Sequence, residues 1–180
     1  MIFIGIDNGL SGGIVAIDER QNILLKTPMP LIITDKKYYD VQKIVEIINQ
    51  FKEVDKIQVI VEKSFIQIMD GKKSCFNMGF CYGLIQGLLT AMNVPFEIVA
   101  PQVWMKEIFQ GAYAKSEKVS VLYCVRKYPN TNWIIGTRAK TIHDGMTDAC
   151  CIALYGHKQF YGTLHARLNE ENKDKLLGGD

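Results

Sequence analysis

The sequence has almost no excess charge of either sign. Its 21 Lys and Arg residues are balanced by 19 Asp and Glu residues, so the formal net charge is only +2. Proteins that bind nucleic acid neutralise phosphates with an excess of Lys and Arg. Taken over the whole chain, the charge therefore argues weakly against a nucleic-acid partner.

The cysteines are odd in number and do not form a paired framework. Five Cys residues occur, at positions 75, 81, 124, 150 and 151, without the paired framework of a small secreted domain. This excludes a disulfide scaffold and predicts free thiols in a reducing compartment. The first residues also lack the basic region and cleavage site of a secretory signal. We therefore expect a cytoplasmic protein, in a bacterium or in a phage-infected host.

The sequence has no long run of purely apolar residues. The longest uncharged stretch is 74–96, and it contains the polar residues Asn77, Gln86, Thr90 and Asn93. We therefore expect no membrane span. A composition of 48% hydrophobic and 22% charged residues is that of an ordinary soluble globular protein. We expect one domain over residues 1–164 and a polar tail over residues 165–180.

The spacing of apolar residues predicts a mixed sheet covered by helices. The predicted strands are Ile2–Ile6, Gly12–Ile17, Ile23–Lys26, Ile57–Val61 and Phe96–Ala100, and the predicted helices cover about 41–51, 76–92, 101–108, 116–128 and 144–160. Pro28 and Pro30 break the pattern after the third strand, so a polar loop is expected there. Because the first three strands are contiguous, the order argues against an alternating doubly wound fold.

Carboxylates follow two of these strands and share one face of the last helix. Asp7 and Glu62 each end an apolar strand, so they converge if those strands are neighbours. Asp144 and Asp148 are four residues apart on a helix. Clustered carboxylates are unfavourable unless a cation neutralises them, and oxygen ligands favour Mg²⁺ or Mn²⁺. Two such ions are the usual apparatus of phosphodiester hydrolysis.

Each carboxylate also has a structural interpretation. Asp is common in turns at strand ends and at helix N-termini. Asp144 is the weakest candidate, because it is also a good N-cap for its own helix. The joint pattern, more than any single residue, indicates the metal site.

Four short sequence blocks occur in order between residue 2 and about residue 157. They are Gly5-Ile6-Asp7-Asn8-Gly9-Leu10-Ser11-Gly12-Gly13, then Val61-Glu62, then Ala100-Pro101-Gln102-Val103 with Lys106, and Asp144-Gly145-Met146-Thr147-Asp148-Ala149 with Ile152-Ala153. In these blocks the sequence resembles the RuvC family of Holliday-junction resolvases, and most of all its phage and prophage forms. The resemblance implies an RNase H-like α/β fold, in which a five-stranded mixed sheet with its first three strands antiparallel is flanked by helices.

The same resemblance implies a crossover junction endodeoxyribonuclease. Such an enzyme is a homodimer that cuts four-way DNA junctions by two-metal hydrolysis, which leaves 5′-phosphates. The resemblance leaves open whether other branched DNA is also cut. It would act in DNA recombination, DNA repair or phage DNA processing. Asp7, Glu62 and Asp148 carry over as ligands of two Mg²⁺ ions, for which Mn²⁺ can substitute. The family's fourth ligand often lies three residues before the last Asp, where this chain has Gly145. Asp144 is then the expected fourth ligand, with His143 as the alternative.

Basic residues are concentrated in one part of the chain. Residues 101–140 hold 7 basic and 2 acidic groups, so this segment alone carries +5. The resemblance places Lys106 at the scissile or an adjacent phosphate and Lys118, or Lys115, at another phosphate. Arg138 and Lys140 belong to the same segment and are also expected to contact DNA. Arg126 and Lys127 are equally well explained as a solvated helix face.

Aromatic residues and glycines suggest two further contacts. Phe65, three residues after Glu62, is placed by the resemblance where it can stack on an unpaired base, with core packing as the alternative. Trp104 and Trp133 are expected in the core or an interface.

One helix carries three glycines on a single face. They are Gly79, Gly83 and Gly87, and Phe76, Phe80, Leu84 and Leu88 lie nearby on the same helix. Small residues at this spacing permit close helix crossing, so this helix is the expected two-fold interface.

Two other functions compete with the nuclease. The first block also resembles the phosphate-binding hairpin of actin-like sugar kinases, although a pair of such domains needs about 350 residues or more. This chain would then be a fragment of a nucleotide-binding kinase. The other alternative is a module that binds junctions without cutting them, in which the carboxylates would be dispensable.

Overall fold

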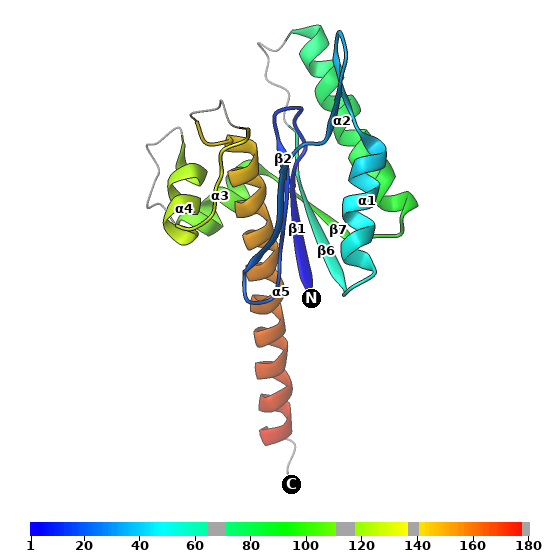
Figure 1. Cartoon of the computed structure of the whole chain (residues 1–180). Coiled ribbons are helices and arrows are strands. Elements are labelled where there is room, and N and C mark those ends of the chain that lie inside the picture. Colours follow the sequence, from blue (N-terminus) through cyan, green and yellow to red (C-terminus); the bar gives the residue numbers. More distant parts are fainter. Residues whose placement is uncertain (65–70, 111–117, 137–140, 178–180) are drawn as a thin grey trace.

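A five-stranded mixed sheet forms the centre of the molecule (Figure 1). The computed structural model describes residues 1–64, 71–110, 118–136 and 141–177. The strands lie in the order β3-β2-β1-β6-β7, with bounds Ile23–Pro28, Gly13–Ile17, Ile2–Asp7, Ile57–Glu62 and Phe96–Val99. β1, β2 and β3 are antiparallel, whereas β6 runs parallel to β1 and β7 parallel to β6. The predicted mixed sheet is therefore confirmed.

Helices cover both faces of the sheet, as Figure 1 shows. One face carries α1 (Val41–Lys52) and α2 (Lys72–Ala91), and the other carries α3 (Pro101–Phe109), α4 (Val119–Lys127) and α5 (Asp144–Leu177). Successive side chains of a strand point to opposite faces. Ile4 accordingly packs with Ile48 and Ile85 in one core, while Phe3 packs with Ile152 in the other. Two apolar layers thus hold the sheet from both sides.

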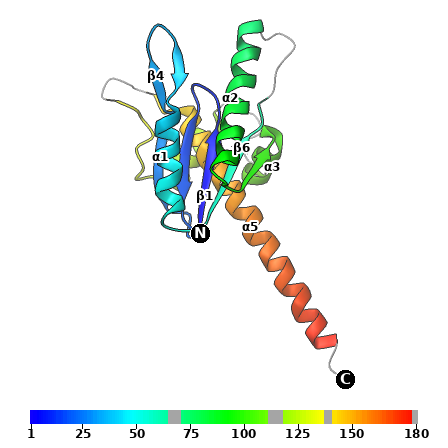
Figure 2. The same ribbon diagram turned by 90° about the vertical axis from the view of Figure 1, so that its right-hand side faces the viewer.

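The helices begin and end close to the predicted positions, with one exception. Asp40 caps α1 by accepting a hydrogen bond from the Lys43 N–H at 3.0 Å, and Pro101 starts α3. The predicted end of the last helix at Phe160 is wrong, because α5 continues to Leu177 and extends away from the sheet (Figure 2). The segment after Phe160 has no proline and is rich in good helix formers. The expected polar tail continues this helix as far as Leu177.

The polar loop expected after Pro30 is instead a second, small hairpin. β4 (Leu31–Ile33) and β5 (Lys37–Tyr39) pair in antiparallel fashion, and the Thr34 N–H donates to the Lys36 carbonyl at 2.9 Å to close the turn. The β-branched and aromatic residues of the two short runs favour this pairing. The β4–β5 hairpin projects past the ends of β1 and β6 (Figure 1).

The uncharged run around residues 74–96 folds as most of α2, a turn and the first residue of β7. Within the described ranges, no helix combines the length and the hydropathy required to cross a bilayer.

Candidate active site

Asp7 and Glu62 lie side by side at one edge of the sheet. The parallel pairing of β1 with β6 aligns Ile6 with Val61, and each carboxylate is the next residue of its strand. The two acids therefore leave the sheet at the same end, as expected if the two strands are neighbours. Asp7 Oδ1 accepts the Gly9 N–H at 3.1 Å, which holds its carboxylate toward the following turn.

Glycines allow α5 to pack directly against the turn between β1 and β2. Gly12 and Gly145 pair in a short parallel bridge. A Cβ atom on Gly145 would overlap the Ser11 carbonyl and the Gly12 Cα, and one on Gly5 would overlap the backbone of Ala149. This close approach places the first turn of α5 beside Asp7. It also explains why position 145 carries no side chain.

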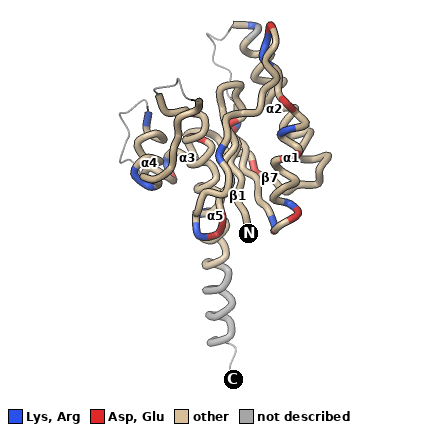
Figure 3. The backbone as a smooth tube through the Cα atoms, viewed as in Figure 1, with Lys and Arg blue, Asp and Glu red and all other residues tan. Residues whose placement is uncertain are grey.

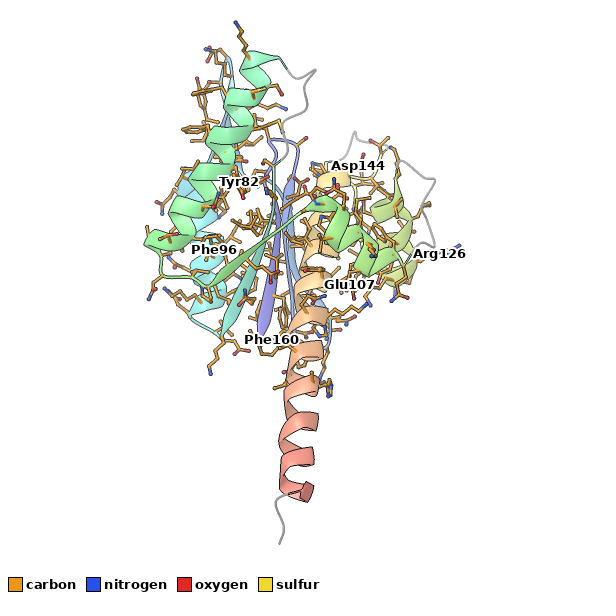
Figure 4. All side chains as sticks on the ribbon, turned by 180° about the vertical axis from the view of Figure 1, so that it is seen from behind. Tyr82, Phe96, Glu107, Arg126, Asp144 and Phe160 are labelled. Atoms are coloured by element: carbon orange, nitrogen blue, oxygen red, sulfur yellow. The ribbon has the colours of Figure 1, made fainter. Side chains whose placement is uncertain are left out.

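The N-cap interpretation of Asp144 is wrong. The residue before α5 is His143, whose ring Nδ1 accepts the Met146 N–H at 3.2 Å. The hydrogen bond engages Nδ1 and assigns the ring proton to Nε2. Asp144 is the first helical residue, and its exposed side chain lies at the upper end of α5 (Figure 4). Asp144 is therefore the better placed of the two candidates for a fourth ligand.

Burial and mutual repulsion raise the pKa values of three of these acids. Burial, with the charge of Asp148, raises the pKa of Asp7 to about 6 against the opposing Gly9 hydrogen bond. Burial and the charge of Asp7 raise the pKa of Glu62 to about 7. Burial also raises the pKa of Asp148, although a hydrogen bond from Ser120 lowers it. No ion pair among the described residues involves any of the three. Within the described residues, these acids therefore gather at one place without forming an ion pair to a basic side chain.

Asp7, Glu62 and Asp148 lie close enough for their charges to repel one another. The part of the chain that the structure describes contains no group of three His, Cys, Asp or Glu side chains close enough to enclose a metal ion. The charge of Asp148 raises the pKa of Asp7, and the charges of Asp7 and Asp148 both raise the pKa of Glu62. Mg²⁺ is typically held by only one or two carboxylates, with water and substrate oxygens completing its shell. The donor set of this site fits a hard cation of that kind.

Two clefts meet at Asp7. The larger, of about 1080 Å³, is also lined by Lys118, Asp144 and Asp148. The smaller, of about 590 Å³, is lined by Asp7 together with Glu62. A chain molecule lying in both clefts would therefore pass over Asp7, with acids on either side.

The predicted phosphate-binding residues differ in their placement. Lys118, at the start of α4, lines the larger cleft with the acids. Lys106 is exposed on α3 and lines neither cleft. Trp104, two residues earlier, points at Glu62. Because two residues span about 200° of a helix, Lys106 lies on the opposite face of α3. Figure 4 shows Arg126 on the outer side of α4. The remaining candidates, Phe65, Lys115, Arg138 and Lys140, lie outside the described residues.

Trp104 has a role in the site that sequence reasoning missed. Its ring is buried in the core as expected, and its indole N–H also donates to Glu62 Oε1 at 2.9 Å. This hydrogen bond lowers the pKa of Glu62 against the effect of burial. Ser120 does the same for Asp148 and also contacts the Thr147 hydroxyl at 3.2 Å. In the sequence, the only sign of this role was that Trp104 lies within the block that runs from Ala100 to Lys106.

Trp104→Phe is expected to raise the pKa of Glu62 further above 7. The substitution retains an aromatic ring and removes the N–H, and a hydrogen bond to a charged group contributes about 1.5–3 kcal/mol, so the expected rise is about one to two pKa units. NMR titration of the labelled Glu62 carboxyl carbon measures it. Trp133→Phe is the matched control, because the Trp133 Nε1 has no described partner. An unchanged Glu62 titration in Trp104→Phe would contradict this role.

The fold belongs to the RNase H-like α/β class. The chain is similar to Thermus thermophilus RuvC in complex with a Holliday junction substrate, with a TM-score of 0.60, 16% identity, and coverage of 91% of this chain and 97% of that one. A second T. thermophilus RuvC structure is similar with a TM-score of 0.56 and 18% identity, over 91% of this chain and 98% of that one. The yeast mitochondrial Holliday junction resolvase Ydc2 is similar with a TM-score of 0.54 and 14% identity, over 92% of this chain and 83% of that one. No protein-family model and no curated protein matches the sequence. The chain thus has a RuvC-like fold, as its motifs predicted.

Proposed function

We propose that the protein is a Mg²⁺-dependent endonuclease that cuts four-way DNA junctions. The observation that carries this proposal is the meeting of Asp7, Glu62 and Asp148 at one edge of an RNase H-like sheet, where two clefts join. The substrate class is supported by the likeness to a RuvC structure that holds a Holliday junction. Its expected setting is DNA recombination, DNA repair or phage DNA processing in the cytoplasm.

The carboxylates would hold two Mg²⁺ or Mn²⁺ ions, one between Asp7 and Glu62 and one between Asp7 and Asp148 with Asp144. The ions would supply an activated nucleophile and stabilise the leaving oxygen of an in-line displacement. Trp104 and Ser120 favour the ionised forms of Glu62 and Asp148 through their hydrogen bonds.

The protein's cations would position the DNA strand that crosses the carboxylates. Lys118 lines the larger cleft and would contact a phosphate next to the cut. Lys106, on the exposed side of α3, would contact DNA further from the carboxylates. The expected products carry 5′-phosphates.

The expected homodimer would use the exposed face of α2. The side chains of Phe76 and Phe80 are 70% and 57% exposed, and their stacked rings have centroids 6.2 Å apart. Gly79, Gly83 and Gly87 have open space where a Cβ would lie. The helix of a second copy could therefore approach closely and cover both rings. A two-fold dimer would present two active sites to the two equivalent strands of a junction.

Phe80→Glu is expected to convert the dimer into a monomer. A charge buried in an apolar interface without a partner is strongly unfavourable, so the mass measured by sedimentation should fall from twice 20.4 kDa to 20.4 kDa. Leu122→Glu is the control, because Leu122 is also an exposed apolar residue but lies on α4. A wild-type protein that sediments as a monomer at all concentrations would contradict this interface.

The deciding experiment compares three labelled DNA substrates with and without Mg²⁺. They are a four-way junction, a linear duplex of the same sequence and a flap. The proposal predicts paired nicks across the junction that require Mg²⁺ and little cutting of the linear duplex. Tight junction binding without Mg²⁺-dependent cutting would instead support the junction-binding module, in which the carboxylates do no chemistry.

A further inference from the structure

The base of the β4–β5 hairpin is attached to the active site. Tyr39 is buried, and its hydroxyl donates to the carbonyl oxygen of Asn8, the residue after Asp7. Alternate residues of a strand face the same side. Lys37, two residues before Tyr39, therefore faces the carboxylate site, whereas Tyr38 faces away from it. The hairpin's attachment thus fixes which of its side chains point toward Asp7.

Lys37 lines both of the clefts that meet at Asp7. Its backbone pairs with Ile33 in the hairpin, whereas its ammonium forms no ion pair among the described residues. The other lysine on this side of the larger cleft, Lys43, is paired with Glu46 at 3.0 Å. The charge of Lys37 is therefore available to a ligand in the clefts, whereas that of Lys43 is already engaged.

Lys37 and Lys118 approach the carboxylates from opposite sides of the sheet. The hairpin belongs to the side of the molecule that carries α1 and α2, and Lys118 immediately precedes α4 on the other side (Figure 3). Both residues line the larger cleft with Asp7. A strand that crosses Asp7 between them would have one cation on each side, which suits a polyanion with regularly spaced phosphates.

We propose that Lys37 binds a backbone phosphate of the DNA strand in the active site, on the side opposite Lys118. This inference rests on the proposed nuclease function and adds the β4–β5 hairpin to the DNA-binding surface. The ligand is a phosphodiester backbone rather than a base, because a Lys ammonium acts as a point charge that carries no sequence information.

The test measures binding of a labelled four-way junction in EDTA at several NaCl concentrations. Lys37→Ala is expected to weaken binding about 5- to 10-fold at low salt and to reduce the slope of log K against log[salt] by about 1, as for the loss of one phosphate contact. Lys37→Arg should restore most of the affinity. Lys36→Ala is the matched control, because Lys36 lines the groove between the hairpin and α2 and lines neither of the clefts at Asp7. It should bind within about twofold of wild type.

The outcomes separate this inference from the proposed function. Wild-type affinity and an unchanged salt slope in Lys37→Ala would overturn the role of Lys37, and the nuclease would still be judged by Mg²⁺-dependent cutting with wild-type protein. An equal loss in Lys36→Ala would overturn it too, because the hairpin would then act only through its general charge. A wild-type protein that neither binds nor cuts the junction would overturn both proposals.

Discussion

Asp7→Asn should lower the rate of Mg²⁺-dependent junction cleavage by about 10³-fold or more while leaving junction binding intact. Asp7 belongs to both of the proposed ion sites, so its loss would weaken both of them. Asn has nearly the same shape and can still accept the Gly9 N–H. The effect would therefore come from the missing charge rather than from a disturbed turn. Single-turnover cleavage and a binding assay on the same junction measure the two quantities.

Asp18→Asn is the matched control for this substitution. Asp18 directly follows β2, as Asp7 ends β1, but its carboxylate accepts hydrogen bonds from the Arg20 and Asn22 backbone in an ordinary turn. Its cleavage rate should stay within about twofold of wild type, as for a surface substitution away from the site. Equal cleavage by wild type and Asp7→Asn would contradict the proposed mechanism.

The metal-free protein should lose stability as the pH rises from about 4 to 7. The pKa of Asp7 rises from 3.8 to about 6 on folding, and that of Glu62 from 4.5 to about 7. The folded state therefore binds protons more tightly than the unfolded state, and the free energy of unfolding falls with pH across this window. The stabilisation is complete below the unfolded pKa values and is lost above the folded ones. One pKa unit corresponds to 1.36 kcal/mol, so Asp7 alone accounts for about 3 kcal/mol.

Urea unfolding in EDTA at pH 4.5 and pH 8 measures this dependence. The difference between wild type and Asp7→Asn isolates the site from acids elsewhere, such as Asp55, whose pKa is lowered by the N-terminal amine. At pH 8 the variant should be more stable than wild type by about 3 kcal/mol. Millimolar Mg²⁺ should stabilise wild type and have little effect on the variant. Identical pH dependence of the two proteins would contradict the electrostatic account of the site.

The acids of the site could be predicted because each follows from a local pattern. Asp7 and Glu62 end short apolar runs, and Asp144 and Asp148 are spaced four apart on a helix. Their convergence depended on the resemblance, because no local pattern shows that β1 pairs with β6. The role of Gly145 needed the structure, since only the packing of α5 on Gly12 shows why no side chain fits there.

Other features depend on tertiary contacts that the sequence does not display. The hydrogen bond from Trp104 to Glu62 exists because α3 turns that side chain inward. The β4–β5 hairpin was missed because its two strands are only three residues long, follow two prolines and are separated by a charged turn, so the sequence pattern indicates a loop. The near-zero net charge sums the acids at the sheet edge with the basic excess of residues 101–140, so the total does not show that the two are separate. The distribution of charge is more informative about DNA than its total.

The account is tested most directly by anomalous diffraction from crystals grown with Mn²⁺ and a four-way junction. It predicts two Mn²⁺ peaks that share Asp7, one next to Glu62 and one next to Asp148, with the DNA backbone passing over them. Mn²⁺ bound elsewhere, or DNA bound on a face away from these acids, would contradict it.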